Sequence, residues 1–569
     1  MKKEKTLSIQ KYLSIYKGLR LPWLFLLLSV AGAILNYLFT LNLADLTADV
    51  VSATGDVETA KLAGYVIAAL MVVIGTTASY WFREIAAQKI NLSLRIKLWK
   101  KLVHLPRNQY DKDGGEGFVS RITTDCTFSS TFFTMMVELA SLTVGIVIYY
   151  VELFSTNTTI STASILILPV TVLIAWGYGK LCYVVNLKNQ DRLSETTEYL
   201  VERVYNMPLL RASNMQEKER QAGIQRFDTL YKVEIQKGLL ASLNTFINGA
   251  VPVISMAIVF VVGAKFVNAG AMTAGGVYAF YLVANSAATL FANIVDYAGS
   301  IRGSIGAMER VAETLEQSEE DIRSGEVAPK NAKVTVDHVT FGYTETPILN
   351  DAEITIPENK LTVIVGANGA GKSTLFRLLE RYYIPNEGAI CVNGKAAGAY
   401  SVESWRQRIG YMPQDGVLMA GTIRTNLSMG ADHLYSDEEI SAVAKKLALD
   451  SFFASLPDGF DSAVEAGGKN YSGGQKQLLG MMRVLLYNPE ILLLDEATSN
   501  LDAHSARQIK EALKKICQSR TVVMIAHDLQ TILEADHAII LRDGKAVYAG
   551  DPRKVLTEIN DYRKEIMGQ

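Results

Sequence analysis

Long runs without a charged residue occupy the first half of this 569-residue chain and limit what it can fold into. A helix needs about 20 consecutive apolar residues to cross the hydrocarbon core of a membrane. Six segments are candidate spans, and the third reaches that length only if Glu138 or Glu152 is accommodated near an interface or a cavity. The predicted spans are residues 21–44, 62–82, 139–151, 157–179, 239–264 and 269–295. The sequence therefore predicts a membrane domain of six helices.

The charges between these spans predict their orientation. Basic residues gather before the first span and between the second and third, whereas the first connection is acidic, with Asp45, Asp49, Asp56 and Glu58. Because cytoplasmic connections carry an excess of Lys and Arg, we expect the N-terminus and the even-numbered connections to be cytoplasmic. The apolar run that begins at Leu21 is too long for a cleavable signal peptide. These features predict a multi-pass protein of the plasma membrane or of a bacterial inner membrane.

The second half of the chain carries a motif for binding nucleotide phosphates. Residues 366–373 fit the pattern G-x-x-x-x-G-K-S/T and follow the apolar, strand-like run 361–365. Glycines let the backbone amides turn toward phosphates, Lys372 adds a positive charge, and the Ser373 hydroxyl can bind Mg²⁺. The predicted phosphate-binding residues are Gly366, Ala367, Asn368, Gly369, Ala370, Gly371, Lys372, Ser373 and Thr374.

Two carboxylates end a second apolar strand. Residues 491–494 lead directly into Asp495 and Glu496. We expect Asp495 to hold Mg²⁺, directly or through water, and Glu496 to orient or deprotonate the attacking water, which is the positioning that phosphoryl transfer requires. With the phosphate loop, these carboxylates predict Mg²⁺-dependent phosphoryl transfer from a nucleotide, which would also admit kinases and GTPases.

A further string, Tyr471-Ser-Gly-Gly-Gln475, narrows the class of nucleotide-binding protein. It resembles the signature of ABC ATPases, in which the residues matching Ser472, Gly473, Gly474 and Gln475 contact ATP bound to the opposite subunit. The resemblance also implies roles for single residues in this order along the chain. Tyr343 would stack on adenine, Gln414 would touch Mg²⁺, Asp502 would lie at the dimer interface, and His527 would contact the γ-phosphate. Each of these residues taken alone is more often structural, but their joint order favours the functional interpretation.

Some positions depart from the family pattern. Tyr471 stands where leucine is commonest, and Asn500 stands where alanine is commonest. Ala466 falls where many related exporters have a glutamate, although Glu465 is adjacent. Because that loop couples ATP binding to the membrane domain in the family, the departure concerns coupling rather than hydrolysis.

The resemblance extends into the first half. Residues 105–125 resemble the first intracellular loop of the exporter-type (type IV) ABC fold, and residues 307–311 resemble the end of its sixth helix. The implied fold class is a six-helix membrane domain followed by an α/β P-loop ATPase domain. The predicted divisions are a cytoplasmic N-terminus with an elbow helix (1–20), the membrane domain (21–314), a polar linker (315–332) and the nucleotide-binding domain (333–569).

One membrane domain and one ATPase domain make a half-transporter. In this family the phosphate loop and the signature meet only across a dimer, so the chain is expected to pair with a second copy or with a related half-transporter. The implied function is transport of a small amphipathic compound, lipid or peptide. The same fold also serves some siderophore or metal-chelate importers, and a regulatory ATPase that does not transport is a further alternative; a soluble P-loop kinase is excluded by the spans and the signature together.

Ionisable residues near the spans are candidates for substrate binding. Glu138 and Asp296 border or lie in apolar segments, where a carboxylate exposed to lipid is costly. They either face a cavity, where they would attract a cationic or metal-chelate substrate, or lie solvated at the interface. A net charge of −2 gives no indication of nucleic-acid binding.

Overall fold

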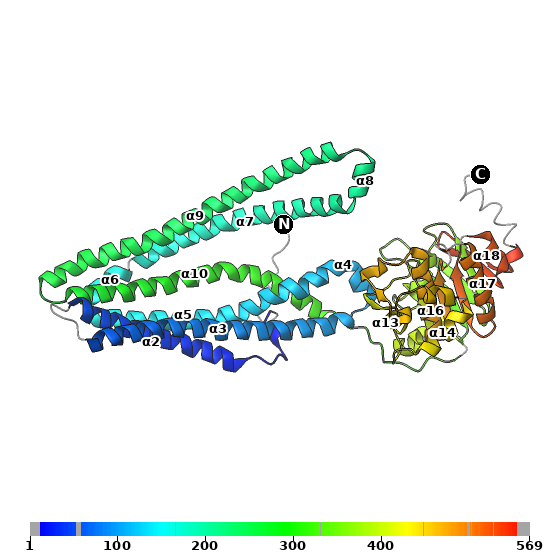
Figure 1. Ribbon diagram of the computed structural model, residues 1–569, viewed down its shortest axis with the longest axis horizontal. Coiled ribbons are helices and arrows are strands. Elements are labelled where there is room, and N and C mark those ends of the chain that lie inside the picture. The colour runs from blue at the N-terminus through cyan, green and yellow to red at the C-terminus, as the bar shows by residue number, and fades with distance from the viewer. Residues whose placement is uncertain are drawn as a thin grey trace. The chain divides into compact units, whose positions relative to one another are not determined.

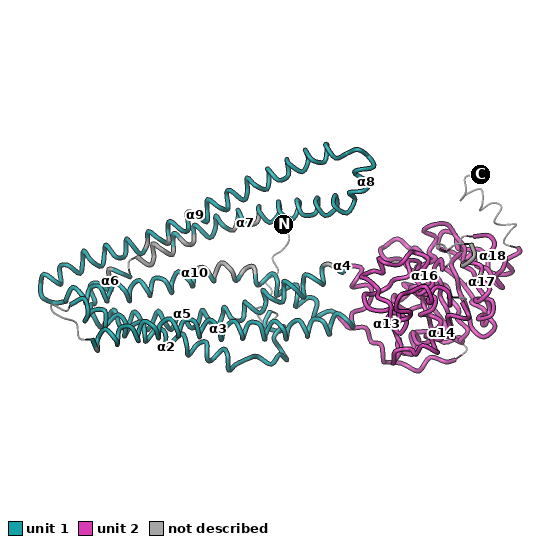
Figure 2. Tube along the Cα trace, viewed as in Figure 1, with its two compact units in different colours: residues 1–104, 113–317 teal, residues 105–112, 318–569 magenta. Residues whose placement is uncertain are grey.

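The computed structural model describes residues 12–52, 59–165, 167–330, 332–447, 449–497, 501, 503–526 and 528–554. The chain divides into two compact units, which Figure 2 shows in different colours. The first comprises residues 1–104 and 113–317, and the second comprises residues 105–112 and 318–569. The domain boundaries set from the sequence stay predictions.

Long helices make up the first unit (Figure 1). They are η1 (Ser14–Tyr16), α2 (Trp23–Ser52), α3 (Thr59–Val103), α4 (Arg107–Ser120), η2 (Arg121–Asp125), α5 (Cys126–Thr156), α6 (Thr158–Ile165), α7 (Ile167–Tyr205), α8 (Met207–Ala212), α9 (Gln216–Asn268) and α10 (Ala274–Glu316). The helices α3 and α7 continue well beyond the predicted spans, because the polar sequences that follow each apolar run are still helix-forming.

Five helices within the described residues are long and apolar enough to cross a membrane. These are Trp23–Ser52, Lys61–Val103, Gly117–Thr156, Gln216–Asn268 and Ala274–Ile294, and they coincide with five of the six predicted spans. The fourth predicted span, 157–179, falls on α6 and α7 and includes residues outside the described ranges; it is not among the five. The sixth span begins later than predicted, because the Thr273 side chain accepts a hydrogen bond from the Gly276 amide and caps α10 there.

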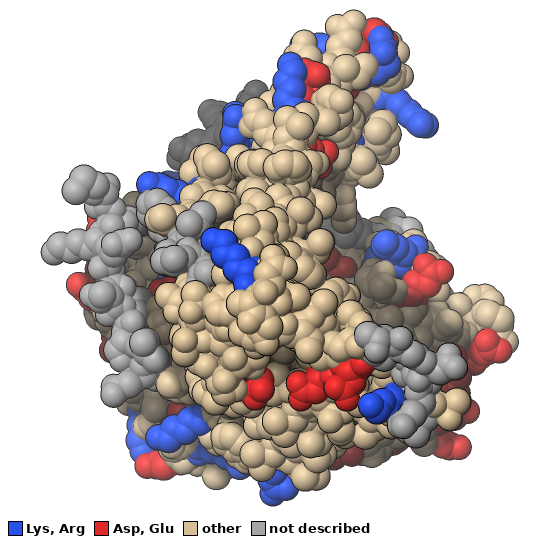
Figure 3. All heavy atoms as spheres, turned by 90° about the vertical axis from the view of Figure 1, so that its left-hand side faces the viewer, with Lys and Arg blue, Asp and Glu red and all other residues tan. Residues whose placement is uncertain are grey.

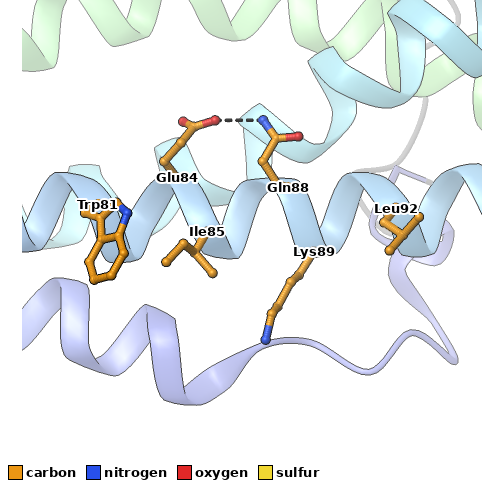
Figure 4. A pocket seen from close by; sticks show the side chains of 6 residues that line it. All are labelled: Trp81, Glu84, Ile85, Gln88, Lys89 and Leu92. Atoms are coloured by element: carbon orange, nitrogen blue, oxygen red, sulfur yellow. Dashed lines mark hydrogen bonds between the residues drawn. The ribbon is translucent and has the colours of Figure 1, made fainter.

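The apolar side chains of these helices lie largely on the outside of the first unit. No more than 33% of any of the five apolar segments is buried within it. Figure 3 shows one end of the molecule, where uncharged side chains dominate the visible surface. A helix that is apolar and outward-facing over 20 residues or more is suited to a lipid environment, since all its backbone polar groups are bonded internally.

A polar pair lies between two of these helices. The Arg83 guanidinium of α3 contacts the Glu138 carboxylate of α5 at 2.5 Å, and both side chains are mostly buried. Glu138 is thus paired and mostly buried rather than solvated at an interface, and its expected role in substrate binding stays a prediction. The side chain of Asp296 lies outside the described residues.

The N-terminal segment packs onto the first unit from residue 12 onward. Ile15 and Tyr16 are buried, and the Tyr16 hydroxyl donates to the Ser129 carbonyl at 2.5 Å. Lys97 donates to the carbonyls of Ile15 and Lys17, both at 2.9 Å. Of the predicted N-terminal segment with its elbow helix (1–20), residues 1–11 lie outside the described residues, and the described part contains the short helix η1.

Two sheets form the framework of the second unit. The larger has the strand order β12-β11-β3-β10-β9-β6 in the described part of the chain, with all neighbours parallel except β12. The smaller has the order β2-β1-β4-β5 and is antiparallel. The strands are β1 (Val334–Phe341), β2 (Leu349–Ile356), β3 (Leu361–Gly366), β4 (Glu387–Val392), β5 (Lys395–Ala396), β6 (Ile409–Met412), β7 (Gly421–Thr422), β8 (Ala463–Val464), β9 (Ile491–Asp495), β10 (Thr521–Ile525), β11 (His537–Arg542) and β12 (Lys545–Gly550).

Helices cover the larger sheet. They are α11 (Lys372–Leu379), α12 (Val402–Arg406), α13 (Ile423–Leu427), α14 (Asp437–Lys446), α15 (Asp450–Ala454), α16 (Gly473–Tyr487), α17 (Ala503–Ile516) and α18 (Leu529–Glu534), with short turns η3 (Ala397–Ala399), η4 (Gly459–Asp461) and η5 (Ala466–Gly468). Every residue of β3, β9 and β10 is buried. Their continuous apolar sequences are typical of central parallel strands that are covered on both faces.

Two segments that lead into the second unit from the membrane helices are fixed to it. Residues 105–112 belong to this unit, and the Tyr383 hydroxyl donates to the Asp111 carboxylate. In the segment predicted as a linker, Arg406 binds both carboxylate oxygens of Glu320, at 2.9 and 2.7 Å. The amide of Glu326 also donates to the Ala399 carbonyl at 2.9 Å, so this acidic segment follows the surface of the unit rather than hanging free.

Candidate active site

The predicted site residues follow four neighbouring strands of the parallel sheet. The phosphate loop follows β3, Glu496 follows β9, and Gln414 follows β6. The fourth strand, β10, lies between β3 and β9 and leads toward His527. Since the carboxyl ends of parallel strands meet at one edge of a sheet, the topology places these loops together, which is where ligands bind in open α/β folds.

Glycines shape the phosphate loop. Gly369 and Gly371 have φ angles of +85° and +98°, which side chains with a Cβ atom rarely adopt. A Cβ atom on Gly371 would also lie 2.7 Å from the Leu349 side chain. The loop then enters α11 at Lys372, so the amides of the first helical turn are available for an anion.

The loop lysine is folded back over the loop. Its Nζ atom donates to the carbonyls of Gly366 and Ala367, at 2.8 and 3.0 Å. Burial lowers the pKa of Lys372, whereas the carboxylates of Glu496 and Asp495 act in the opposite sense. These two carboxylates therefore approach the predicted phosphate position and help to keep the lysine charged.

Hard oxygen donors come together beside the loop. Burial raises the pKa of Asp495, and a hydrogen bond from the Ser373 hydroxyl opposes that rise. A hydroxyl and a carboxylate in contact fit Mg²⁺, which prefers oxygen ligands and completes its shell with water and phosphate. Ser373 and Asp495 would hold the ion; the side chain of Gln414, the third predicted ligand, bonds to Glu496, and the metal site stays a prediction.

Glu496 and Gln414 face one another. The Gln414 amide donates to the Glu496 carboxylate at 2.7 Å, joining the loops after β6 and β9. Glu496 has a φ of +50°, in the left-handed region that is uncommon for residues other than glycine. The structure thus brings these two predicted residues together and gives the carboxylate a constrained backbone.

An aromatic cluster surrounds Tyr343. Its ring lies edge-on to Phe341 and Tyr383, with centroids 5.2 and 5.1 Å away. Arg377 donates to the Tyr343 hydroxyl at 2.8 Å, which steadies the ring while leaving 40% of the residue exposed. The sequence analysis did not identify Arg377 or Tyr383. Arg377 lies five residues after the loop lysine on α11, which was a usable signal, whereas Tyr383 has no local one.

The signature string begins a helix. Ser472 is the N-cap of α16, and its hydroxyl accepts from the Gln475 amide at 3.2 Å while the Gln475 side chain accepts from the Ser472 amide at 2.9 Å. This capping box fixes the first turn, in which Gly473 and Gly474 carry no side chains that would cover the backbone amides. The first turn is therefore suited to an anion.

Two predicted site residues, Asp502 and His527, lie outside the described residues, as does Asn500. Their assignments stay predictions, although β10, which precedes His527, has the predicted place in the sheet.

A parallel P-loop sheet with paired carboxylates, in one chain with apolar membrane-length helices, defines a membrane-bound nucleotide hydrolase. Two family models match the chain. The model for the ABC transporter transmembrane region matches residues 23–289, and the model for the ABC transporter matches residues 349–499.

Curated relatives match over most of the chain. A multidrug resistance ABC transporter ATP-binding and permease protein of Lactococcus lactis is 26% identical, over 99% of this chain and 96% of its own. An ATP-dependent lipid A-core flippase of Desulfotalea psychrophila is 26% identical, over 84% of each. An ABC-type oligopeptide transporter of Homo sapiens is 28% identical, over 84% of this chain and 63% of its own.

The chain belongs to the ABC transporters, as a half-transporter of the exporter type with fused transmembrane and ATP-binding domains. It is a multi-pass membrane protein that binds and hydrolyses ATP. Neither the described residues nor the names of these relatives support the alternative of siderophore import.

Proposed function

We propose that two such half-transporters form a dimer that moves a small amphipathic compound, a lipid or a peptide across the cell membrane, with ATP hydrolysed at sites composed of residues from both. The observation that carries the proposal is the Gln414–Glu496 contact beside a complete phosphate loop. The names of the three relatives, which concern drugs, lipid A and oligopeptides, support the range of substrates.

The residues of the site would divide the work of hydrolysis. Lys372 and the loop amides would bind the β- and γ-phosphates, and Tyr343 would stack on adenine. Ser373 and Asp495, with Gln414 nearby, would hold Mg²⁺, which when bound would supply positive charge to the phosphate oxygens. Glu496 would accept a proton from the water that attacks the γ-phosphate, or orient that water. Gln414, already bonded to Glu496, would fix the direction of the carboxylate.

The dimer follows from the place of the signature. In the proposed arrangement, Ser472 and the first amides of α16 would contact the nucleotide held by the partner's phosphate loop. Closure of the two ATPase domains on ATP would then move the membrane helices, and hydrolysis would release them. The basic N-terminal and second connections support a cytoplasmic ATPase domain, where ATP is available.

The test of the catalytic assignment is Glu496→Gln in the full-length protein in lipid nanodiscs. Binding of MgATP should persist, while hydrolysis should fall by at least about 100-fold, since positioned acid–base groups typically contribute roughly 10²–10⁴. Lys372→Ala is the matched variant, because it should weaken binding itself. Near-normal turnover of the Glu496→Gln protein would remove that residue from its role.

The test of assembly uses two inactive chains. A Ser472→Arg chain cannot present its signature and a Lys372→Ala chain cannot bind phosphate, so each should be inactive alone. If two copies form the dimer, purified mixed dimers should regain one complete site and measurable hydrolysis. Verified mixed dimers without any recovery would favour a distinct, related partner chain.

A further inference from the structure

A fully buried glutamine lies behind the proposed catalytic pair. We infer that Gln477 is a positioning residue for ATP hydrolysis, holding the backbones of Glu496 and Gln414 so that their side chains meet. The inference rests on the proposed catalytic role of Glu496. Gln477 is at the fifth position of α16, has 0% exposure, and lies two residues beyond the signature.

Gln477 binds two loops at once. Its Nε2 atom donates to the Gln414 carbonyl at 3.0 Å and to the Glu496 carbonyl at 3.3 Å. A side-chain amide has two N–H donors, so one NH₂ group can serve both acceptors. The side chains of the same two residues bond to one another at 2.7 Å. Gln477 thus closes a ring that runs from β6 to β9 through α16.

The backbone of Glu496 has a strained conformation that neighbouring contacts must hold in place. Its φ of +50° is a conformation that costs free energy for a residue with a Cβ atom, and it persists only where neighbouring contacts impose it. The hydrogen bond from Gln477 to the Glu496 carbonyl holds the peptide that follows this strained residue. Loss of that bond would let the peptide rotate and the carboxylate turn away from Gln414.

Close packing brings the loop after β6 within reach of α16. Gly416 has a φ of +51°, and a Cβ atom there would lie 2.6 Å from the Lys476 backbone. Gly480, one turn further along α16, lies against Gly416 and Met412. These two glycines let the loop approach the helix closely enough for Gln477 to reach the Gln414 carbonyl.

The same helix begins at the signature. Ser472 caps α16, and Gln477 follows after little more than one turn, so a shift of the signature moves the group that holds Glu496. In the proposed dimer, the signature faces the nucleotide of the partner while Glu496 serves the nucleotide of its own chain. Gln477 would therefore make the geometry of one site depend on the state of the other.

The experiment replaces Gln477 with methionine in the full-length protein, which keeps the length of the side chain and removes both donors. Leu479→Met is the matched control, because Leu479 is buried on the same helix and touches the hydrophobic core. We expect kcat to fall by roughly 10- to 100-fold, as misplacement of a catalytic group typically does. The KM for MgATP should change less than about threefold, since nucleotide binding does not require the positioned carboxylate.

A double variant separates positioning from simple destabilisation. If Gln477 acts through Glu496, adding Gln477→Met to Glu496→Gln should reduce the residual activity little further, whereas independent effects would multiply. Gln477→Glu is the second variant if the methionine protein does not fold, and we expect a loss of kcat there too, because a carboxyl group, even when protonated, can donate to only one of the two carbonyls.

The outcomes separate the positioning role of Gln477 from the catalytic role of Glu496. Unchanged kcat in Gln477→Met, or a multiplied loss in the double variant, would overturn the positioning role while leaving Glu496 in place. A parallel rise in KM with loss of folded protein would also overturn it. Normal turnover in Glu496→Gln alone would instead refute the proposed function, on which the inference depends.

Discussion

Replacing Arg83 with methionine would remove the positive charge that faces Glu138 between α3 and α5. The two side chains are only 20% and 16% exposed and touch at 2.5 Å, so the carboxylate would be left mostly buried without its partner. Breaking a buried pair in this way typically costs about 3–5 kcal/mol, and partial exposure places our expectation at the lower end, about 3 kcal/mol. Glu138→Leu alone should cost a similar amount, because it leaves the guanidinium buried.

The double variant Arg83→Met/Glu138→Leu should recover most of the loss, since two apolar side chains of similar volume can replace a buried pair with little net change. Thermal unfolding of the full-length protein in nanodiscs measures this. The shift is about 2–4 °C per kcal/mol for 150–250 residues and smaller for a larger unit such as this one, so each single variant should unfold up to about 6 °C lower and the double variant close to the parent.

Additive losses in the double variant would refute the reasoning, since they would show that the two side chains do not stabilise the fold through one another. The same variants test whether Glu138 attracts a cationic substrate. Because its charge is already paired with Arg83, we expect Glu138→Gln to lower stability, whereas substrate-stimulated ATPase per folded molecule should persist. Lost stimulation at unchanged stability would instead restore the substrate-binding interpretation.

Three further predictions concern the second unit. Gly371→Ala should abolish MgATP binding and lower the free energy of unfolding by about 1–3 kcal/mol, because φ is +98° at this position. A Cβ atom at Gly398 would meet open space, so Gly398→Ala should change neither quantity in binding and unfolding assays. Tyr343→Leu should raise the Kd for ATP about tenfold by removing the stacking ring, and Tyr343→Phe should not. Burial raises the pKa of Glu380 to about 8, so folding stability should fall as pH rises from about 4.5 to 8. Glu380→Gln should make stability less dependent on pH, as measured by unfolding across that range.

Helices and strands that are set by residues close together in the sequence were predicted. Apolar runs marked five membrane-length helices, and the strands β3 and β9 lie where uninterrupted apolar residues precede the phosphate loop and the paired carboxylates. These signals are local, because a helix or strand is set by the pattern of side chains within a few turns.

Pairings between distant elements could not be predicted in this way. Arg83 and Glu138 are 55 residues apart, and nothing in either segment indicates the other. Gln477 resembles any polar residue of a helix until the fold places two carbonyls before its amide. The left-handed backbone of Glu496 is likewise invisible in the sequence, because it is imposed by contacts and is contrary to the preference of the residue itself.

The helix α11 connects the phosphate loop with the two segments through which the chain enters the second unit, residues 105–112 and the segment that follows α10. At its first residue, Lys372 lies over the phosphate loop; at its other end, Glu380 is the C-cap. Arg406 donates to the Glu380 carbonyl at 3.1 Å and also holds Glu320 of the segment that follows α10.

The positive charges of Arg406 and of Arg107, in the segment 105–112, both act on the buried Glu380 carboxylate. Eight helical residues span about 12 Å, so a displacement of the phosphate loop would be carried by one rigid element to both segments that enter the unit. Because α11 is short and packed by Phe376 and Leu379, it has little freedom to absorb such a displacement by bending. We therefore expect variants at Glu380 to weaken the link between ATP binding and transport more than ATP binding itself.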